Sequence, residues 1–270
     1  MKKTILITGA TDGIGRATAE KLASQGHQLL IHGRSEAKLR ATQEALAASC
    51  GSTVESYRAD LSKLDEVQAM AEDLLARSGS LDVVIHNAGV FNTPTPVTAD
   101  GLDIRFVVNA IAPYLLTQRL LPRLSPAGRV INLSSAAQAP VDLRALAGEV
   151  RLGDMAAYSQ SKLALTMWSR YLAQQLGPQG PVILAVNPGS LLATKMVKEA
   201  FGTSRGTVDQ GADILCRAAL DDEFATASGK YFDNDSGRFA APHPDGLNAA
   251  KCEQVVRSIE AVLARLVSKS

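Results

Sequence analysis

The sequence is poor in cysteine, in net charge and in long apolar runs. Its three cysteines, Cys50, Cys216 and Cys252, lie far apart and have no metal-ligand spacing. We therefore expect no metal site, and we expect a reducing compartment. The 270 residues carry a formal net charge of only +1, which gives no reason to expect a nucleic-acid partner.

Long apolar stretches are absent as well. No run approaches the ~18 apolar residues of a membrane-spanning helix, so we expect no membrane span. The apolar run after Lys2 and Lys3 ends at Thr8 and Gly9, which is too short for the ~7–15 apolar residues of a signal peptide. We expect a soluble, cytoplasmic protein.

Short apolar segments alternate with segments of helical pattern along the whole chain. This alternation is typical of an α/β fold, in which a chain of this length can form one domain. Hydrophobic residues make up 46% of the chain, enough for a sizeable core, and neither a repeat nor a linker interrupts it. Strands are expected at residues 4–8, 28–32, 53–58, 81–86, 128–133, 182–186 and 230–232, and the principal helices at 16–25, 36–49, 63–77, 101–124, 155–176 and 247–267.

A glycine-rich loop follows the first expected strand and opens the first helix. It reads Gly9-Ala10-Thr11-Asp12-Gly13-Ile14-Gly15. Glycines let a ligand approach the backbone, and a helix N-terminus offers free N–H groups to an anion. The unit predicts a phosphate-binding loop, although its spacing differs from the better-known Gly-x-Gly-x-x-Gly. A tight turn without a ligand is the alternative.

The residues after the second expected strand bear on the choice of cofactor. Many NAD sites carry an acidic residue about 20 positions after the glycine loop, where this chain has Gly33 and Arg34. A guanidinium pairs with a 2′-phosphate that a carboxylate would repel. We expect NADP, with NAD as the alternative. Glu36 is expected to open the next helix, where an acidic residue suits the helix dipole.

Tyr158 and Lys162 lie one turn apart on the helix expected at residues 155–176. A free tyrosine titrates near pH ~10, and a fixed ammonium beside it lowers that pKa. Two unit charges ~4 Å apart at an effective dielectric of ~20 interact by roughly 4 kcal/mol, enough to bring the phenol close to neutrality. Such a tyrosine can exchange a proton with an alcohol or carbonyl oxygen. A surface tyrosine and a solvated lysine are the alternative.

Further candidates directly follow the expected strands, and open α/β sheets bind ligands at the carboxyl ends of their strands. Ser134 is expected to complete a strand end and is the alternative to its neighbour Ser135. The candidates are Asp60 and Leu61, Asn87-Ala88-Gly89, Ser134-Ser135 and Pro188-Gly189.

Together these residues resemble the short-chain dehydrogenase/reductase family. The matches follow the family's order and cover nearly the whole chain. The run from Tyr158 to Ala164 is most similar to the retinol-dehydrogenase-like branch and its bacterial relatives. The matching motifs are Thr8-Gly9-x-x-x-Gly13-x-Gly15, Asp60, Asn87-Ala88-Gly89, Asn109, Ser135, Tyr158-x-x-x-Lys162 and Pro188-Gly189.

The resemblance implies one α/β domain over residues 1–270, with a doubly wound (Rossmann) seven-stranded parallel sheet flanked by helices. It implies a nicotinamide dinucleotide cofactor, a cofactor half at about residues 1–135, and a catalytic and substrate half at about residues 136–270. The reaction would be hydride transfer between the nicotinamide and a small-molecule alcohol or carbonyl substrate.

The resemblance also implies roles for individual residues. Tyr158 would be the general acid or base, and Lys162 would lower its pKa and bind the nicotinamide ribose. Ser135 would hydrogen-bond the reacting oxygen, and Asn109 would hold a water in a proton relay to Lys162. The implied cofactor contacts are Gly9, Thr11, Asp12, Gly13, Ile14, Gly15, Arg34, Asp60, Leu61, Asn87, Ala88, Gly89, Tyr158, Lys162, Pro188, Gly189 and Thr194.

Four positions depart from the family's pattern. His86 replaces an asparagine, and Asp12 is acidic where NADP-preferring members often carry a base, which weakens the NADP expectation. Ser135 and Tyr158 lie 23 positions apart, farther than the commonest spacing, although the retinol-dehydrogenase-like branch also has a longer segment here. Thr194 follows the proline of Pro-Gly by six positions, where the family's threonine usually follows by five.

Two other functions remain open. One is a non-catalytic dinucleotide-binding sensor, which usually lacks the tyrosine or the lysine. The other is a sugar-nucleotide epimerase or dehydratase, which typically carries a larger C-terminal region than this chain can hold.

We expect an apolar substrate, because two segments that leave the carboxyl edge of the sheet are rich in apolar side chains. These segments, residues 136–157 and 190–207, are expected to cover the mouth of the site. Anchoring of each segment to the sheet is the alternative role. The side chains are Pro140, Val141, Leu143, Leu146, Val150, Leu152, Leu191, Leu192, Met196, Val197 and Phe201.

The resemblance finally implies a homodimer or homotetramer that pairs through the helices carrying Asn109 and Tyr158. The expected contacts are Leu115, Leu116, Met167 and Trp168. Burial of these side chains in the core is the alternative.

Overall fold

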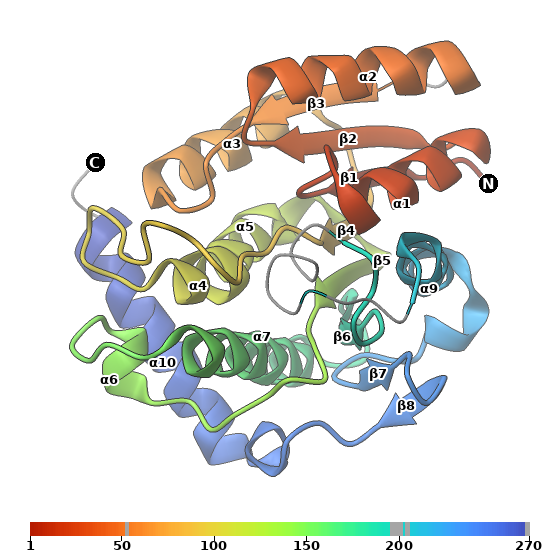
Figure 1. Ribbon diagram of the computed structural model, residues 1–270. Helices are drawn as coiled ribbons and strands as arrows, with labels where there is room; N and C mark the ends of the chain where they lie inside the picture. Colours follow the sequence, from red (N-terminus) through yellow and green to blue (C-terminus); the bar gives the residue numbers. More distant parts are fainter. Residues whose placement is uncertain (52–53, 195–201, 203–205, 268–270) are drawn as a thin grey trace.

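The computed structural model describes residues 1–51, 54–194, 202 and 206–267. The described strands form one sheet in the order β3-β2-β1-β4-β5-β6-β7-β8, and helices flank it (Figure 1). The strands are β1 (Thr4–Ile7), β2 (Gln28–Gly33), β3 (Val54–Arg58), β4 (Leu81–His86), β5 (Leu124–Leu133), β6 (Val182–Asn187), β7 (Tyr231–Asp233) and β8 (Arg238–Ala240). The helices named below are α1 (Gly13–Ser24), α2 (Glu36–Cys50), α3 (Leu64–Arg77), α4 (Ile104–Phe106), α5 (Ala112–Leu120), α6 (Leu143–Leu146), α7 (Asp154–Leu176), α9 (Val208–Leu220) and α10 (Ala249–Leu266).

Strands β1 to β7 are parallel, which confirms the doubly wound α/β fold. The expected number of seven strands is corrected by an eighth, β8, which runs antiparallel to β7. Phe239 of β8 packs against Phe224 and Phe232, and this contact holds the added strand to the sheet edge. A strand of three residues with one large apolar side chain is too short to show a strand pattern in the sequence.

Alternate residues of each strand are buried on opposite faces of the sheet. Leu6 and Val84 face the core shared with α3, α5, α7 and α10, whereas Ile5 and Val83 face the core shared with α1, α2 and α9. Because both faces are covered, the central strands are apolar nearly throughout. This continuous apolar character is the reason that their positions could be predicted.

The helix expected at residues 101–124 is interrupted. It consists of α4, a π-helical turn (Val107–Ile111), α5 and a short 3-10 turn (Leu121–Arg123), and β5 already begins at Leu124. Pro113 at the start of α5 has no N–H to donate to the carbonyl oxygen of Asn109, so a regular helix cannot continue through this point. The π-helical turn places Asn109 in the interior, at 1% exposure.

The apolar side chains expected to pair two copies of the chain are buried within one copy. Leu115, Leu116, Met167 and Trp168 are at most 5% exposed, because α10 packs along α7 and belongs to the same core. The Tyr114 hydroxyl on α5 donates to Glu260 on α10 (2.7 Å). These four residues are therefore core residues rather than subunit contacts.

Across the described residues, none of the helices combines the length and the apolar character that crossing a membrane requires.

Candidate active site

The carboxyl ends of β1 to β6 open into one cleft. Its volume is about 660 Å³, within the range of ~300–1,000 Å³ found for small-molecule and cofactor sites. Two of the residues expected in the site, Gly15 and Asn109, do not line it. Those that do are Gly9, Thr11, Asp12, Gly13, Ile14, Arg34, Asp60, Leu61, Asn87, Ala88, Gly89, Ser135, Tyr158, Lys162, Pro188, Gly189 and Thr194.

Two glycines let the loop after β1 pack tightly against the end of β4. Gly9 has a φ of +67°, and a Cβ atom on Gly15 would lie 2.3 Å from Asn87 Nδ2 and from the Gly9 carbonyl oxygen. Asn87 Nδ2 donates to that same carbonyl oxygen (3.0 Å). Gly15 therefore does not line the cleft, but its missing side chain lets the loop pack against Asn87. The start of α1 stays at the cleft, where the Asp12 carboxylate accepts a hydrogen bond from the Gly13 N–H (2.8 Å).

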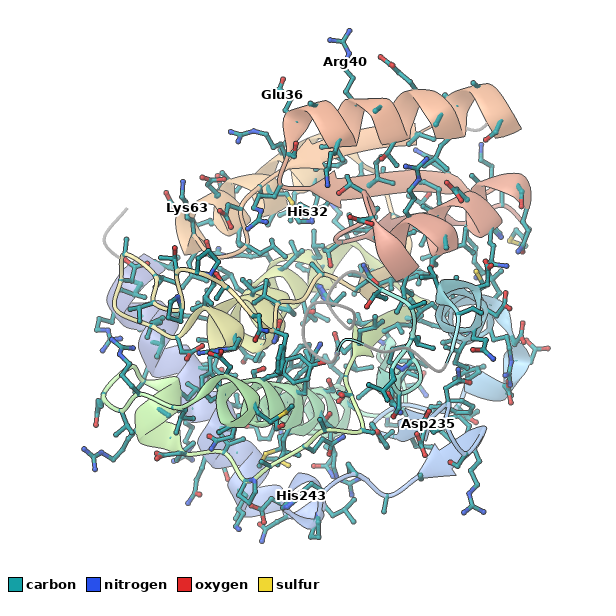
Figure 2. All side chains as sticks on the ribbon, viewed as in Figure 1. His32, Glu36, Arg40, Lys63, Asp235 and His243 are labelled. Atoms are coloured by element: carbon teal, nitrogen blue, oxygen red, sulfur yellow. The ribbon has the colours of Figure 1, made fainter. Side chains whose placement is uncertain are left out.

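The end of the cleft next to β2 carries two basic side chains. Arg34 and Lys38 both line it. Lys38 was not predicted from the sequence. Its position in the first turn of a helix that begins at the cleft could have indicated it. The Lys38 ammonium lies 3.8 Å from the Asp12 carboxylate and offsets its charge. Glu36 is not a lining residue and points away from the sheet (Figure 2).

A buried histidine joins three strand ends at this part of the cleft. His32 on β2 (labelled in Figure 2) accepts a hydrogen bond at Nδ1 from the Gly9 N–H (3.2 Å), and its Nε2 contacts the Ala59 carbonyl oxygen (3.0 Å). Burial lowers the pKa of His32 to about 4, so the ring is neutral and Nε2 donates. Asp60 follows Ala59, and its carboxylate is fixed by accepting from the Ser62 N–H (3.0 Å). Sequence reasoning missed His32 because its partners are distant along the chain.

Tyr158 and Lys162 lie one turn apart on α7, and both line the cleft. Lys162 Nζ donates to the Leu133 carbonyl oxygen (2.7 Å) and lies 5.8 Å from the centre of the Tyr158 ring. Burial lowers the pKa of Lys162 to about 8. The lysine is thus held between β5 and the aromatic ring.

The pKa of Tyr158 is raised, contrary to the expectation of a phenol tuned toward neutrality. Burial raises the pKa, and the neighbouring Ser135 hydroxyl lowers it by less. Lys162 does not reverse the shift; its Nζ donates to the Leu133 carbonyl oxygen. Tyr158 therefore keeps its proton at neutral pH and can act as a proton donor.

The two adjacent serines have different surroundings. Ser134 is buried, and its hydroxyl hydrogen-bonds that of Thr166 (2.7 Å), so it completes the strand end. The backbone of Ser135 is held by two side chains that sequence reasoning did not single out. Its carbonyl oxygen accepts from the Tyr231 hydroxyl (3.1 Å) and from the Gln138 amide (2.9 Å).

Asn109 lies behind the cleft wall and holds part of it in place. Its Oδ1 accepts from the Val90 N–H (2.8 Å), and its Nδ2 donates to the Val90 carbonyl oxygen (3.0 Å) and to the Ser161 hydroxyl (3.0 Å). Val90 directly follows the Asn87-Ala88-Gly89 motif and lines the cleft. The observed contacts give Asn109 a positioning role for this segment.

Among the described apolar side chains that were expected to cover the site, Leu192 lines the cleft, whereas those of the first segment do not. No residue of the segment 136–157, all of which the structure describes, lines the cleft. Its apolar side chains, Leu146 among them, pack into the core beneath α10, because α6 docks on that helix. The expectation that this segment covers the mouth of the site is therefore wrong. The larger apolar side chains that line the cleft are Ile14, Leu61, Val90, Phe91, Val108, Leu133, Pro188 and Leu192.

Phe91 has the closest relation to the predicted chemistry. Its ring meets that of Tyr158 edge-on, with the centres 4.9 Å apart, and it is 7% exposed. Phe91 was not predicted from the sequence, although its position two residues after Gly89 could have indicated that it lies at the cleft. In the second expected segment, Leu192 lines the cleft, whereas Met196, Val197 and Phe201 lie outside the described residues.

These features fit a phosphorylated dinucleotide. Gly9 and Gly13 have no side chains to block the approach of a ligand to the backbone at the N-terminus of α1. The free N–H groups at a helix N-terminus bind anions. Arg34 and Lys38 offer cations at one end, and Tyr158 offers a proton donor at the other. In the described part of the chain, no cluster of His, Cys, Asp or Glu is suited to a metal ion.

Comparison with known proteins gives concordant results. A family model described as short chain dehydrogenase matches residues 3–205. Retinol dehydrogenase 12 of Mus musculus is 36% identical over 243 residues, which cover 85% of this chain and 77% of that protein. Retinol dehydrogenase 13 of Homo sapiens is 31% identical over an alignment of 285 residues, which covers 98% of this chain and 84% of that protein. A short chain dehydrogenase from Burkholderia cenocepacia J2315, solved in complex with NADP, is 27% identical, has a TM-score of 0.69 and covers 87% of this chain and 97% of that chain.

Proposed function

The chain belongs to the short-chain dehydrogenase family, in its retinol-dehydrogenase-like branch, and from this premise we propose an NADP(H)-dependent oxidoreductase acting on alcohol and carbonyl groups. One observation carries the proposal: Tyr158, Ser135 and Lys162 meet in the cleft that the glycine loop also lines. A positioned proton donor beside a dinucleotide-binding loop is what hydride transfer to a carbonyl requires.

In the proposed reduction, the cleft would hold NADPH, which would supply the hydride for the carbonyl carbon. Tyr158 would give its phenolic proton to the carbonyl oxygen, and Ser135, which lines the same cleft, would hold that oxygen in line. Lys162, anchored by the Leu133 carbonyl oxygen, stabilises the phenolate that remains. In the oxidation of an alcohol, the phenolate takes the proton back.

The basic end of the cleft supports NADP over NAD. Arg34 and Lys38 can both pair with a 2′-phosphate, and the Burkholderia cenocepacia dehydrogenase was solved with NADP. Asp12 opposes this preference, but its charge is offset by Lys38. NAD is the second candidate.

The side chains around Tyr158 support an apolar substrate. Phe91 packs against the ring of the proton donor, and Val90 and Leu192 also line the cleft; apolar lining favours an apolar body that carries one polarised oxygen. The relatives named retinol dehydrogenases point the same way, because retinol is an apolar alcohol.

The two other functions considered from the sequence are less well supported. A sensor without chemistry has no need for a tyrosine, a serine and a lysine that meet in the cofactor cleft. The similarity to retinol dehydrogenases favours a dehydrogenase over an epimerase or dehydratase.

Three proposals rest on the sequence and its resemblance. They are a cytoplasmic location, a homodimer or homotetramer, and a division into a cofactor half (about 1–135) and a catalytic half (about 136–270). Pairing of copies has to use surfaces other than the four buried side chains described above.

The test is NADPH oxidation followed spectroscopically with a panel of carbonyl compounds. We expect turnover, with higher kcat/KM for aromatic or long-chain aldehydes and ketones than for small charged keto acids. A preference for pyruvate-like or phosphorylated carbonyls would contradict the apolar cleft. NADPH binding without turnover of any carbonyl would favour the sensor.

A further inference from the structure

The hairpin turn between β7 and β8 contacts the loop that leaves β6. This loop brings Pro188 and Gly189 to the cleft, and Asp235 lies in the turn (Figure 2). The residues joined across this contact are here called the hairpin clamp: Asn187, Ser190, Asp233, Asn234 and Asp235.

Asp235 accepts three hydrogen bonds from the loop. Ser190 donates its backbone N–H to Oδ1 (2.8 Å) and its hydroxyl to Oδ2 (2.5 Å), and Asn187 Nδ2 donates to Oδ2 (2.9 Å). Burial alone would raise the pKa of Asp235, but the hydrogen bonds from Ser190 and Asn187 lower it below its usual value. The carboxylate therefore stays charged, and its hydrogen bonds belong to the stronger, charge-assisted class.

Asn187 is the buried centre of the clamp, at 1% exposure. Its Nδ2 also donates to Asp233 Oδ1 (2.8 Å), and its Oδ1 accepts from the Gly189 N–H (3.2 Å). Asn234 adds two bonds, from its N–H to the Asn187 carbonyl oxygen (3.1 Å) and from its Nδ2 to the Pro188 carbonyl oxygen (2.9 Å). The buried amide thus connects the turn to the backbone at the cleft.

The backbone directly after the clamp is strained. Leu191 has a φ of +52°, which is uncommon for a residue with a side chain and persists only where the surroundings determine it. The next residue, Leu192, packs closely against two glycines. A Cβ atom on Gly206 or Gly211 would lie 2.7 Å or 2.8 Å from a Leu192 methyl carbon. Leu191 therefore lies between two residues that are fixed in place: Ser190 is hydrogen-bonded to Asp235, and Leu192 packs against Gly206 and Gly211.

We propose that the hairpin clamp positions the loop after β6 against the nicotinamide end of the cofactor, with Asp235 and Asn187 as the positioning residues. The inference rests on the proposed function, which puts the nicotinamide beside Tyr158 and this loop. Asp235 is not a cleft-lining residue, so it acts through the loop. Loosening the clamp lets the backbone at Leu191 relax and moves the wall beside the nicotinamide, while the end with Arg34 and Lys38 is unchanged.

The test compares two ligands by fluorescence titration and calorimetry. NADPH occupies the whole site, whereas adenosine 2′,5′-bisphosphate carries the 2′-phosphate but no nicotinamide. We expect Asp235→Ala, which removes all three hydrogen bonds to this carboxylate, to weaken NADPH binding about tenfold, because the loop is then no longer held in place. It should leave binding of the bisphosphate unchanged and should lower kcat. Ser190→Ala removes only the hydroxyl donor and should weaken NADPH binding by a smaller factor.

The matched control is Arg238→Ala. Arg238 is exposed on β8 in the same hairpin, and its removal should change neither affinity. An Asp235→Ala variant that binds NADPH like the wild type, or that loses affinity for both ligands equally, would overturn the proposal. A wild-type protein that binds neither ligand would overturn the proposed function and this inference with it.

A charge swap gives a second test that does not depend on truncation. Asn187→Asp places a third carboxylate against Asp233 and Asp235 and should weaken NADPH binding more than Asp235→Ala does. Adding Asp235→Asn restores a donor opposite the new carboxylate and should recover affinity about tenfold. Since residue 235 does not line the cleft, such recovery can come only through the clamp. Equal affinity of the single and double variants would contradict it.

Discussion

Tyr158 keeps its proton at neutral pH and lines the cleft together with Ser135. Tyr158→Phe should keep the edge contact with Phe91 and remove only the proton donor. We expect turnover to fall by on the order of 10²–10⁴, with NADPH affinity little changed. Steady-state kinetics and an NADPH titration measure the two quantities. A Phe variant that reduces a good substrate at nearly the wild-type rate would show that Tyr158 is not the acid.

The proposed preference for NADP rests on Arg34 and Lys38, which line one end of the cleft. Loss of one charge-assisted phosphate contact costs roughly 1.5–3 kcal/mol, so Arg34→Ala or Lys38→Ala should weaken NADPH binding about ten- to a hundredfold and leave NADH nearly unaffected. Arg40→Ala is the matched control, since Arg40 is exposed on the outer side of α2 and pairs with Glu44 (Figure 2). Equal weakening of NADPH and NADH would argue against a phosphate contact.

Lys162 makes the stability of the protein depend on pH. Its pKa is about 8 in the folded protein, below the ordinary 10.5. Between these pH values the unfolded chain binds more protons, so the free energy of unfolding rises with pH, by at most about 3 kcal/mol from this group. Lys162→Met removes the buried charge and should raise Tm more at about pH 7 than at about pH 9.5. The same change in Tm at both pH values would contradict the lowered pKa.

At the level of elements, strands β1 to β7 and most helices could be predicted, the central strands because burial on both faces leaves continuous apolar runs. The break at Pro113 and the three-residue strand β8 could not, because short elements depend on tertiary contacts. The same division holds in the site. Residues that directly follow strands were predicted, whereas His32, Lys38 and the hairpin clamp depend on segments that meet only in the folded chain.

Arg105 connects two elements of the site. It is 1% exposed and pairs with Asp103 (2.6 Å) and with Asp154 in the first turn of α7, so it ties the helix before Asn109 to the helix of Tyr158. Breaking a buried ion pair costs about 3–5 kcal/mol, and we expect Arg105→Gln to lower the free energy of unfolding by that amount. Denaturant unfolding measures it.

Arg144 provides the control for Arg105. It forms an exposed pair with Glu149 (3.3 Å), and Arg144→Gln should change the free energy of unfolding by less than about 1 kcal/mol. Equally small effects of the two substitutions would show that the buried network does not stabilise the junction.

On the scale of the whole molecule, one cleft gathers Ser135, Tyr158 and Lys162, and α10 packs on the helices that were expected to pair. The sequence could not distinguish core packing from subunit contact, because both leave the same apolar stripe on a helix. Only the position of α10 in the fold separates them.

Hydride transfer itself can be followed with NADPH deuterated at C4 of the nicotinamide on the transferred face. The protein is incubated with this cofactor and a long-chain or aromatic aldehyde, and the alcohol is analysed by mass spectrometry. We predict that the alcohol carries deuterium on the former carbonyl carbon and that Tyr158→Phe abolishes its formation. Bound NADPH with no labelled alcohol from any carbonyl compound would contradict the proposal that this cleft is the active site of an oxidoreductase.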